Sequence, residues 1–197
     1  MRMLVAMAAA TLVAGTATFA QQKAPAEAVA FAKKVASANT FEIQSSELAR
    51  DRSQSGAVKS FADQMIKDHT KAGKDLKAAV ANAQTSPPPP EQPSAKQKAT
   101  LAKLKNAQGA AFDKAYVSAQ LAAHKEAVSL FGKYAKSGRT GPLKQFAQST
   151  LPTLEDHLSM VQELSRPSGV ASRHAPKGSG GAAIGPPAQR PQKANKP

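Results

Sequence analysis

One segment, residues 58–76, repeats its apolar side chains at alternating steps of four and three residues. Because an α-helix turns once every 3.6 residues, this spacing places the repeated side chains on one helical face. The repeated positions are Val58, Ala62, Met65, His69, Ala72 and Leu76. Only His69 is polar, where a leucine would be expected. The segment therefore predicts an amphipathic helix that turns one imidazole toward the core.

Three other segments show the same rhythm, and each carries one ionisable group on its stripe. They cover residues 25–50, 112–136 and 143–164. The ionisable groups are Glu42, His124 and His157, in that order. Turn residues at 53–56 and 137–142 predict breaks between the helices. Pro152 lies inside the last segment and is expected to bend or split that helix.

A proline-rich link, residues 84–95, separates the helices into two pairs, because TSPPPPEQPS cannot form a helix. A further segment begins near Ala95 and is expected to break near Gly109. Two helix pairs joined by a long crossover are the arrangement of ferritin-like bundles. The fold class predicted is all-α, a ferritin-like four-helix bundle over residues 21–165.

Both ends of the chain are expected to lie outside the bundle. Residues 1–20 have one early arginine, a short apolar run and small residues before Gln21, the pattern of a cleavable signal peptide. After its removal no transmembrane segment remains, which predicts a periplasmic or envelope-associated protein. Residues 166–197 are rich in proline, glycine, lysine and arginine and predict a disordered basic tail.

The net charge of +14 favours anionic partners. The tail contributes positive charges without a single acid, and these are candidate polyanion-binding residues. They are Arg166, Arg173, Lys177, Arg190, Lys193 and Lys196. Export favours lipid headgroups or acidic envelope polymers over nucleic acid as the partner.

The chain lacks cysteine, which excludes disulfides and thiolate sites. It carries neither a phosphate-binding glycine loop nor a nucleophile elbow, so enzyme chemistry has little support.

Within residues 28–165 the chain contains the segments FAKKVASANTFEIQSSELA, VKSFADQMIKDHTKAGKDL, AYVSAQLAAHKEAVSLF and LPTLEDHLSMVQEL. Together they resemble a family of bacterial exported domains of unknown function. Its members are often labelled outer-membrane or periplasmic proteins. The resemblance implies a ferritin-like fold and an envelope location, and no established reaction.

Glu42, His69, His124 and His157 come from four different helices and form the candidate site. Such groups are costly to bury unless they are hydrogen-bonded, paired or bound to metal. They could bind one zinc, iron, manganese or copper ion, with Asn39, Asp68 and Asp156 orienting the histidines. The Glu-x-x-His pairs of di-iron centres are absent, because Ile66, Leu121 and Leu154 stand three residues before the histidines.

The alternative is a buried hydrogen-bonded network in which Glu42 accepts from the histidines and no ion is bound. The sequence favours this network, because satisfied core histidines are commoner than ligands. It therefore predicts a non-catalytic envelope protein with a structural or stress-related role, whose tail contacts anionic surfaces. A metal-binding bundle for storage, sensing or redox chemistry is the alternative function.

Overall fold

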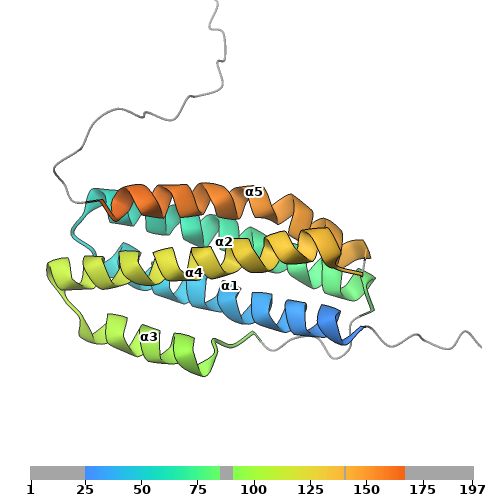
Figure 1. The fold of residues 1–197 in the computed structure, drawn as a ribbon. Helices are drawn as coiled ribbons and strands as arrows, with labels where there is room; N and C mark the ends of the chain where they lie inside the picture. Colours follow the sequence, from blue (N-terminus) through green and yellow to red (C-terminus); the bar gives the residue numbers. More distant parts are fainter. Residues whose placement is uncertain (1–24, 85–90, 140, 167–197) are drawn as a thin grey trace, which may run out of the picture. The chain divides into compact units, whose positions relative to one another are not determined.

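A computed structural model of the chain describes residues 25–84, 91–139 and 141–166. These residues form five α-helices and no strand: α1 (Ala26–Arg52), α2 (Gly56–Asn82), α3 (Ala95–Asn106), α4 (Gly109–Ser137) and α5 (Gly141–Leu164) (Figure 1). The predicted all-α helical bundle is confirmed. The expected signal peptide, residues 85–90 of the proline-rich link and all but Arg166 of the expected tail lie outside the described residues.

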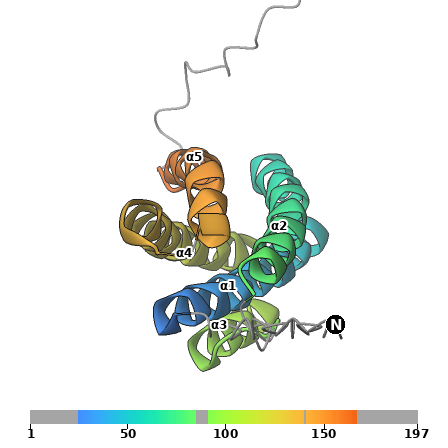
Figure 2. The same cartoon turned by 90° about the vertical axis from the view of Figure 1, so that its right-hand side faces the viewer.

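Four long helices surround the core, and the short α3 lies outside them. α1 packs along α2 and α4 packs along α5, while α2 also contacts α5 and α1 also contacts α4 (Figure 2). The segment after Ala95 breaks where the sequence predicts, because α3 ends at Asn106 and α4 begins at Gly109. Gly109 has a φ of 52°, a conformation that glycine adopts readily.

Two further predictions concern helix boundaries. The break at residues 53–56 is confirmed, and Ser55 caps α2 by accepting a hydrogen bond from the Val58 amide at 3.4 Å. Of the bend or split expected at Pro152, the split is wrong, because α5 runs through this residue without interruption. Leu151 and Leu154, on either side of the exposed proline, pack into the core and hold both halves of the helix.

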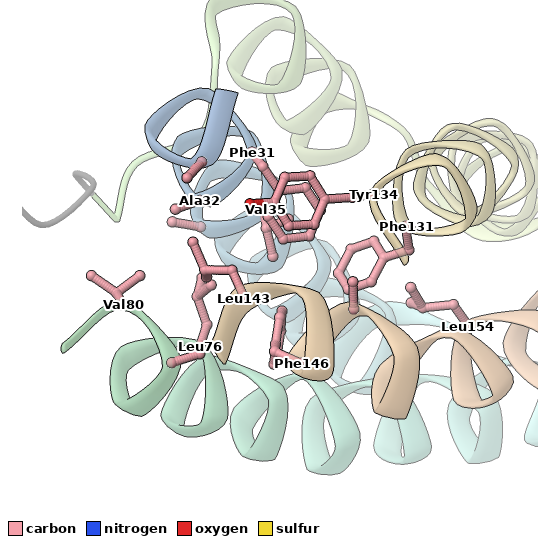
Figure 3. Packing of buried hydrophobic residues seen from close by; sticks show 14 residues of the cluster. Phe31, Ala32, Val35, Leu76, Val80, Phe131, Tyr134, Leu143, Phe146 and Leu154 are labelled. Carbon is pink, nitrogen blue, oxygen red and sulfur yellow. The ribbon is translucent and has the colours of Figure 1, made fainter. Parts of the chain in front are cut away.

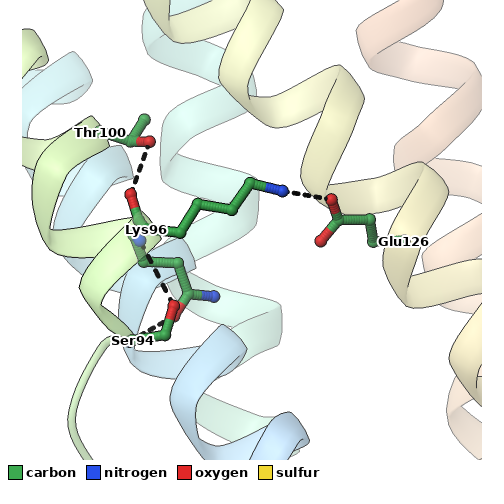
Figure 4. A network of polar contacts seen from close by, with 5 residues as sticks. Ser94, Lys96, Thr100 and Glu126 are labelled. Carbon is green, nitrogen blue, oxygen red and sulfur yellow. Dashed lines mark hydrogen bonds and ion pairs between the residues drawn. The ribbon is translucent and has the colours of Figure 1, made fainter.

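The start of α3 is fixed by local hydrogen bonds (Figure 4) and by one contact with α1. Ser94 and Gln97 form a reciprocal capping box, with the Gln97 side chain 2.7 Å from the Ser94 amide. Ser37 of α1 donates to the same Gln97 oxygen at 2.8 Å. The Lys96–Glu126 ion pair, which joins α3 to α4 at 2.6 Å, is exposed and so adds little stability.

The core consists of two apolar clusters, one toward each end of the bundle. The first apolar cluster joins the start of α1 to the start of α5, and Phe31 stacks on Tyr134 within it with 3.9 Å between ring centroids (Figure 3). The second apolar cluster joins the start of α2 to the end of α5 and is built around Met65, Phe112 and Tyr116. Between the two clusters the middle turns of the four long helices bring polar side chains inward.

Candidate metal centre

Three histidines from three helices meet in the layer between the two apolar clusters. His69 comes from α2, His124 from α4 and His157 from α5, and their exposed fractions are 7%, 1% and 2%. Their ring centroids form a nearly equilateral triangle with sides of 5.8, 5.5 and 5.4 Å. One ligand atom from each ring lies within 4.8 Å of those of the other two. We call this group the three-histidine cluster.

The apolar stripes bring these rings inward. Each histidine occupies a stripe position whose neighbours one turn away are buried, such as Met65 before His69 and Leu154 before His157. The Phe61 ring packs edge-on to His124 at 6.4 Å between centroids. The cluster therefore lies beside apolar surface, which strengthens electrostatic interactions within it.

Each histidine has one ring nitrogen engaged by an acceptor on the protein. His69 Nδ1 donates to Asn39 Oδ1 of α1 at 3.1 Å, and His124 Nδ1 donates to the Gln120 carbonyl at 3.0 Å. His157 Nε2 donates to Asp68 Oδ2 of α2 at 2.9 Å. Because these oxygens accept, the proton of each neutral ring is held on its outer nitrogen.

The second nitrogen of each ring is therefore the one that carries the free lone pair. His69 Nε2, His124 Nε2 and His157 Nδ1 are all buried, and no hydrogen-bond partner among the described residues contacts them. Histidines that bind metal almost always donate their other N–H to a carboxylate or carbonyl oxygen in this way. The hydrogen bonds thus prepare three imidazoles to act as ligands.

The aspartates beside the histidines differ in their contacts. Asp68 accepts from His157, not from its neighbour His69, and is itself held by Gln64 Nε2 at 2.6 Å. Asp156 is exposed and makes no hydrogen bond to a histidine in the described part of the chain. Asn39 and Asp68 therefore orient two of the rings, while Asp156 acts on His157 only through its charge.

Glu42 of α1 is buried in the same layer, with an exposed fraction of 4%, but is not one of the three residues whose ligand atoms converge. Burial raises the pKa of Glu42, while the nearby His124 and a hydrogen bond from Gln120 act in the opposite direction. Its Oε2 lacks a hydrogen-bond partner among the described residues. Glu42 therefore lies close to the cluster without joining it.

Sequence reasoning missed the polar side chains that continue this layer between α1 and α4. Gln120 donates to Ser45 at 3.0 Å, and Ser46 shares a hydrogen bond of 2.9 Å with the Tyr116 hydroxyl. All four side chains are fully buried. Gln120 lies one turn before His124 and could have been found by extending that stripe, whereas the serines give no such signal.

Two of the three imidazoles, those of His69 and His157, are held in their neutral form. Burial lowers the pKa of His69 well below the usual histidine value, and the neighbouring His124 and His157 lower it further. Burial also lowers the pKa of His157, although its hydrogen bond to Asp68 partly opposes this effect. A neutral ring keeps the lone pair that a metal ligand needs.

Fold and site together define an all-α bundle with a buried cluster of three histidines. Two solved structures resemble it. A DUF305 fragment from Deinococcus radiodurans has a TM-score of 0.63 at 15% identity, covering 73% of this chain and 97% of its own. A proposed secreted DUF305 protein from Streptomyces coelicolor has a TM-score of 0.58 at 18% identity, covering 70% and 89%. At these identities the similarity concerns the fold alone.

The sequence profile of a family described as "Domain of unknown function (DUF4142)" matches residues 14–164, and the chain belongs to this family. A comparison with curated proteins found no significant match. Within the described residues no helix is both long and apolar enough to cross a membrane. The family and the fold thus leave function to be argued from the site itself.

Proposed function

We propose that this protein binds one transition-metal ion through His69, His124 and His157. The observation that carries the proposal is that one ligand atom from each of three buried rings lies within 4.8 Å of the other two. In each ring one nitrogen is engaged by an acceptor, and the other has no hydrogen-bond partner among the described residues. One bound ion would engage all three lone pairs at once.

The size of the triangle supports this reading. Ligand nitrogens at the usual 2.0–2.1 Å from a tetrahedral zinc ion lie about 3.4 Å apart. The separations in the three-histidine cluster reach up to 4.8 Å. Binding would therefore draw the rings together by at most about 1.4 Å, which is 4.8 minus 3.4. Small rotations of the imidazoles about their side-chain torsions are sufficient.

The ligand set restricts which ion is bound. Imidazole suits zinc, copper and iron, whereas manganese and magnesium prefer oxygen ligands. Three protein ligands also leave one position of a tetrahedral ion open, as in catalytic zinc sites. We therefore place zinc, copper and iron ahead of manganese. Glu42 lies close enough to His124 to offset part of the charge of the bound ion.

The purely structural alternative explains less of the geometry. A network that served only to fix helix register would be expected to close its own hydrogen bonds. Here Glu42 accepts no hydrogen bond from a histidine among the described residues, and three ring nitrogens would remain desolvated and unpaired. Leaving one such group unsatisfied costs roughly 1–3 kcal/mol.

The deciding experiment measures Co²⁺ uptake by the metal-free chain, purified without a histidine tag. We expect one equivalent of Co²⁺, visible d–d absorption and displacement by Zn²⁺. His69→Ala, His124→Ala and His157→Ala should each abolish this spectrum while circular dichroism shows that the bundle is folded. His174→Ala is the matched control, because the fourth histidine lies outside the described residues. Equal uptake by the parent and the cluster variants would refute the proposal.

The two aspartates provide a second matched pair. Asp68→Ala should weaken Co²⁺ binding by about 10–100-fold, as is usual when a group that orients a metal-binding histidine is removed. Asp156→Ala should leave the affinity unchanged, because Asp156 is exposed and does not bond to the ring. Equal effects of the two substitutions would mean that charge near His157 matters and orientation does not.

Location and tail function are also proposals. We propose that the chain is exported and has a ferritin-like ancestry, in keeping with the neighbour described as a proposed secreted protein and with the paired helices α1–α2 and α4–α5. The basic tail would contact anionic envelope polymers. Its one described member, Arg166, pairs with Glu163 at 2.7 Å. Deleting residues 167–197 should abolish salt-sensitive binding to anionic vesicles without changing Co²⁺ uptake.

A further inference from the structure

A groove of about 430 Å³ runs between α1 and α2, and His69 does not line it. Its walls include Asn39 and Thr40 from α1 and Thr70 and Gly73 from α2. A first-row metal ion with six waters occupies roughly 180 Å³, taking about 30 Å³ for each water. The groove is therefore large enough to hold a hydrated ion.

Asn39 separates this groove from the three-histidine cluster. Its side chain is half-buried, lines the groove and is hydrogen-bonded by His69 at 3.1 Å. His69 is also the most exposed of the three histidines, at 7% against 1% and 2%. The Asn39 carboxamide is thus the contact that links the groove to the cluster.

Gly73 has no side chain, and the Asn39 carboxamide occupies the space that one would fill. A Cβ atom at position 73 would lie 2.9 Å from Asn39 Nδ2, closer than side-chain carbons normally approach another atom. The Asn39 side chain therefore fills a gap opposite a residue without a side chain. Among the described residues, turning it into the groove breaks one hydrogen bond, the one from His69.

We propose that metal ions reach and leave the three-histidine cluster through the α1–α2 groove, with the Asn39 side chain as the gate. This inference rests on the proposed function. A competing route would pass between α2 and α5 at Asp68, whose side chain is 20% exposed. Asp68 is fixed by two hydrogen bonds, from Gln64 and from His157, so it is held more firmly than Asn39.

The test compares two substitutions of Asn39 in the full chain, with Co²⁺ as the probe. Stopped-flow absorbance gives the uptake rate, and an excess of chelator gives the release rate. Asn39→Ala removes both the gate and the hydrogen bond, whereas Asn39→Leu removes the hydrogen bond but keeps a side chain of similar volume. Gly132→Ala, at a helical glycine whose added Cβ would meet nothing within 4 Å, is the control.

We expect Asn39→Ala to raise both rates at least about fivefold over the parent, and Asn39→Leu to raise the uptake rate by less than about twofold. Equal rates in the two variants would overturn the inference, because Asn39 would then only orient His69. Faster uptake in Asp68→Ala but not in Asn39→Ala would place the route between α2 and α5 instead. A parent chain that takes up no Co²⁺ would refute the proposed function and the gate together.

Discussion

The metal-free protein should lose stability on mild acidification because His69 cannot take up a proton while the bundle is folded. The perturbation is a change from pH 7 to pH 5.5, measured with and without the substitution His69→Leu. His69 is buried, and burial together with His124 and His157 lowers its pKa well below 6.5. The unfolded chain, in contrast, protonates this residue near pH 6.5.

The direction follows from proton linkage. Because the unfolded state binds more protons than the folded state, the free energy of unfolding falls as the pH drops through 6.5. A histidine that stays neutral in the fold contributes a loss of about 1.3 kcal/mol between pH 7 and pH 5.5. His157, whose pKa is also lowered, adds a loss of the same sign. The loss continues until the pH reaches the folded pKa of each ring.

Glu42 acts in the opposite sense. The pKa of Glu42 is raised in the fold, so the folded state still holds a proton at a pH where the unfolded state, with a pKa near 4.5, has released it. Acidification through this range therefore stabilises the bundle. Asp68 and Asp156 also face His157 from α2 and α5. The pH dependence of the parent alone therefore mixes several groups, and the difference between parent and His69→Leu isolates the histidine.

Urea unfolding followed by circular dichroism at constant ionic strength, with chelator present, measures this difference. We expect the pH-dependent loss to be smaller by about 1.3 kcal/mol in His69→Leu than in the parent. His174→Ala, outside the described residues, is the control for a histidine outside the cluster. Identical pH profiles in parent and His69→Leu would refute the claim that His69 is neutral in the fold, and would weaken the case for a free lone pair.

Three other predictions concern single side chains, each measured as a change in the free energy of unfolding. Gly132→Ala should stabilise the bundle by about 0.5–1 kcal/mol, because the added Cβ meets no atom within 4 Å. Gly73→Ala should stabilise it by less, because the added Cβ meets the Asn39 side chain. Equal effects would contradict the close approach of Asn39 to Gly73. Tyr116→Phe should cost about 1–2 kcal/mol by leaving the buried Ser46 hydroxyl unpaired, and adding Ser46→Ala should restore part of the loss. Arg52→Lys should destabilise α3 by about 1–2 kcal/mol, because only a guanidinium can donate to three carbonyl oxygens at the end of that helix at once. An unchanged unfolding curve would show that these hydrogen bonds add no stability.

The periodicity of the sequence was sufficient to predict the four long helices and their inward faces. Of the six stripe positions in residues 58–76, only Ala72 is not fully buried. The turn residues located the breaks at 53–56 and near Gly109. The continuity of α5 through Pro152 was not predictable, because the packing of Leu151 and Leu154 that holds the helix together is a tertiary effect.

The composition of the site was harder to predict than its location. The stripes identify His69, His124 and His157 as inward residues, but give no information on how far along the bundle each one lies. The structure brings the three histidines to one depth and leaves Glu42 beside them, outside the convergent group. Relative depth depends on how the α1–α2 and α4–α5 pairs slide against each other, which no periodicity within a single helix encodes.

The hydrogen bonds to the outer nitrogens show how that depth is fixed. Two of them cross between helices, from His69 to Asn39 of α1 and from His157 to Asp68 of α2. A slide of one turn, about 5.4 Å, would break both and would also separate the rings, whose centroids are only 5.4–5.8 Å apart. These two contacts would thus be enough to set the register of α1, α2 and α5. The three inner nitrogens add nothing to register and carry a desolvation cost, which binding a metal ion would remove.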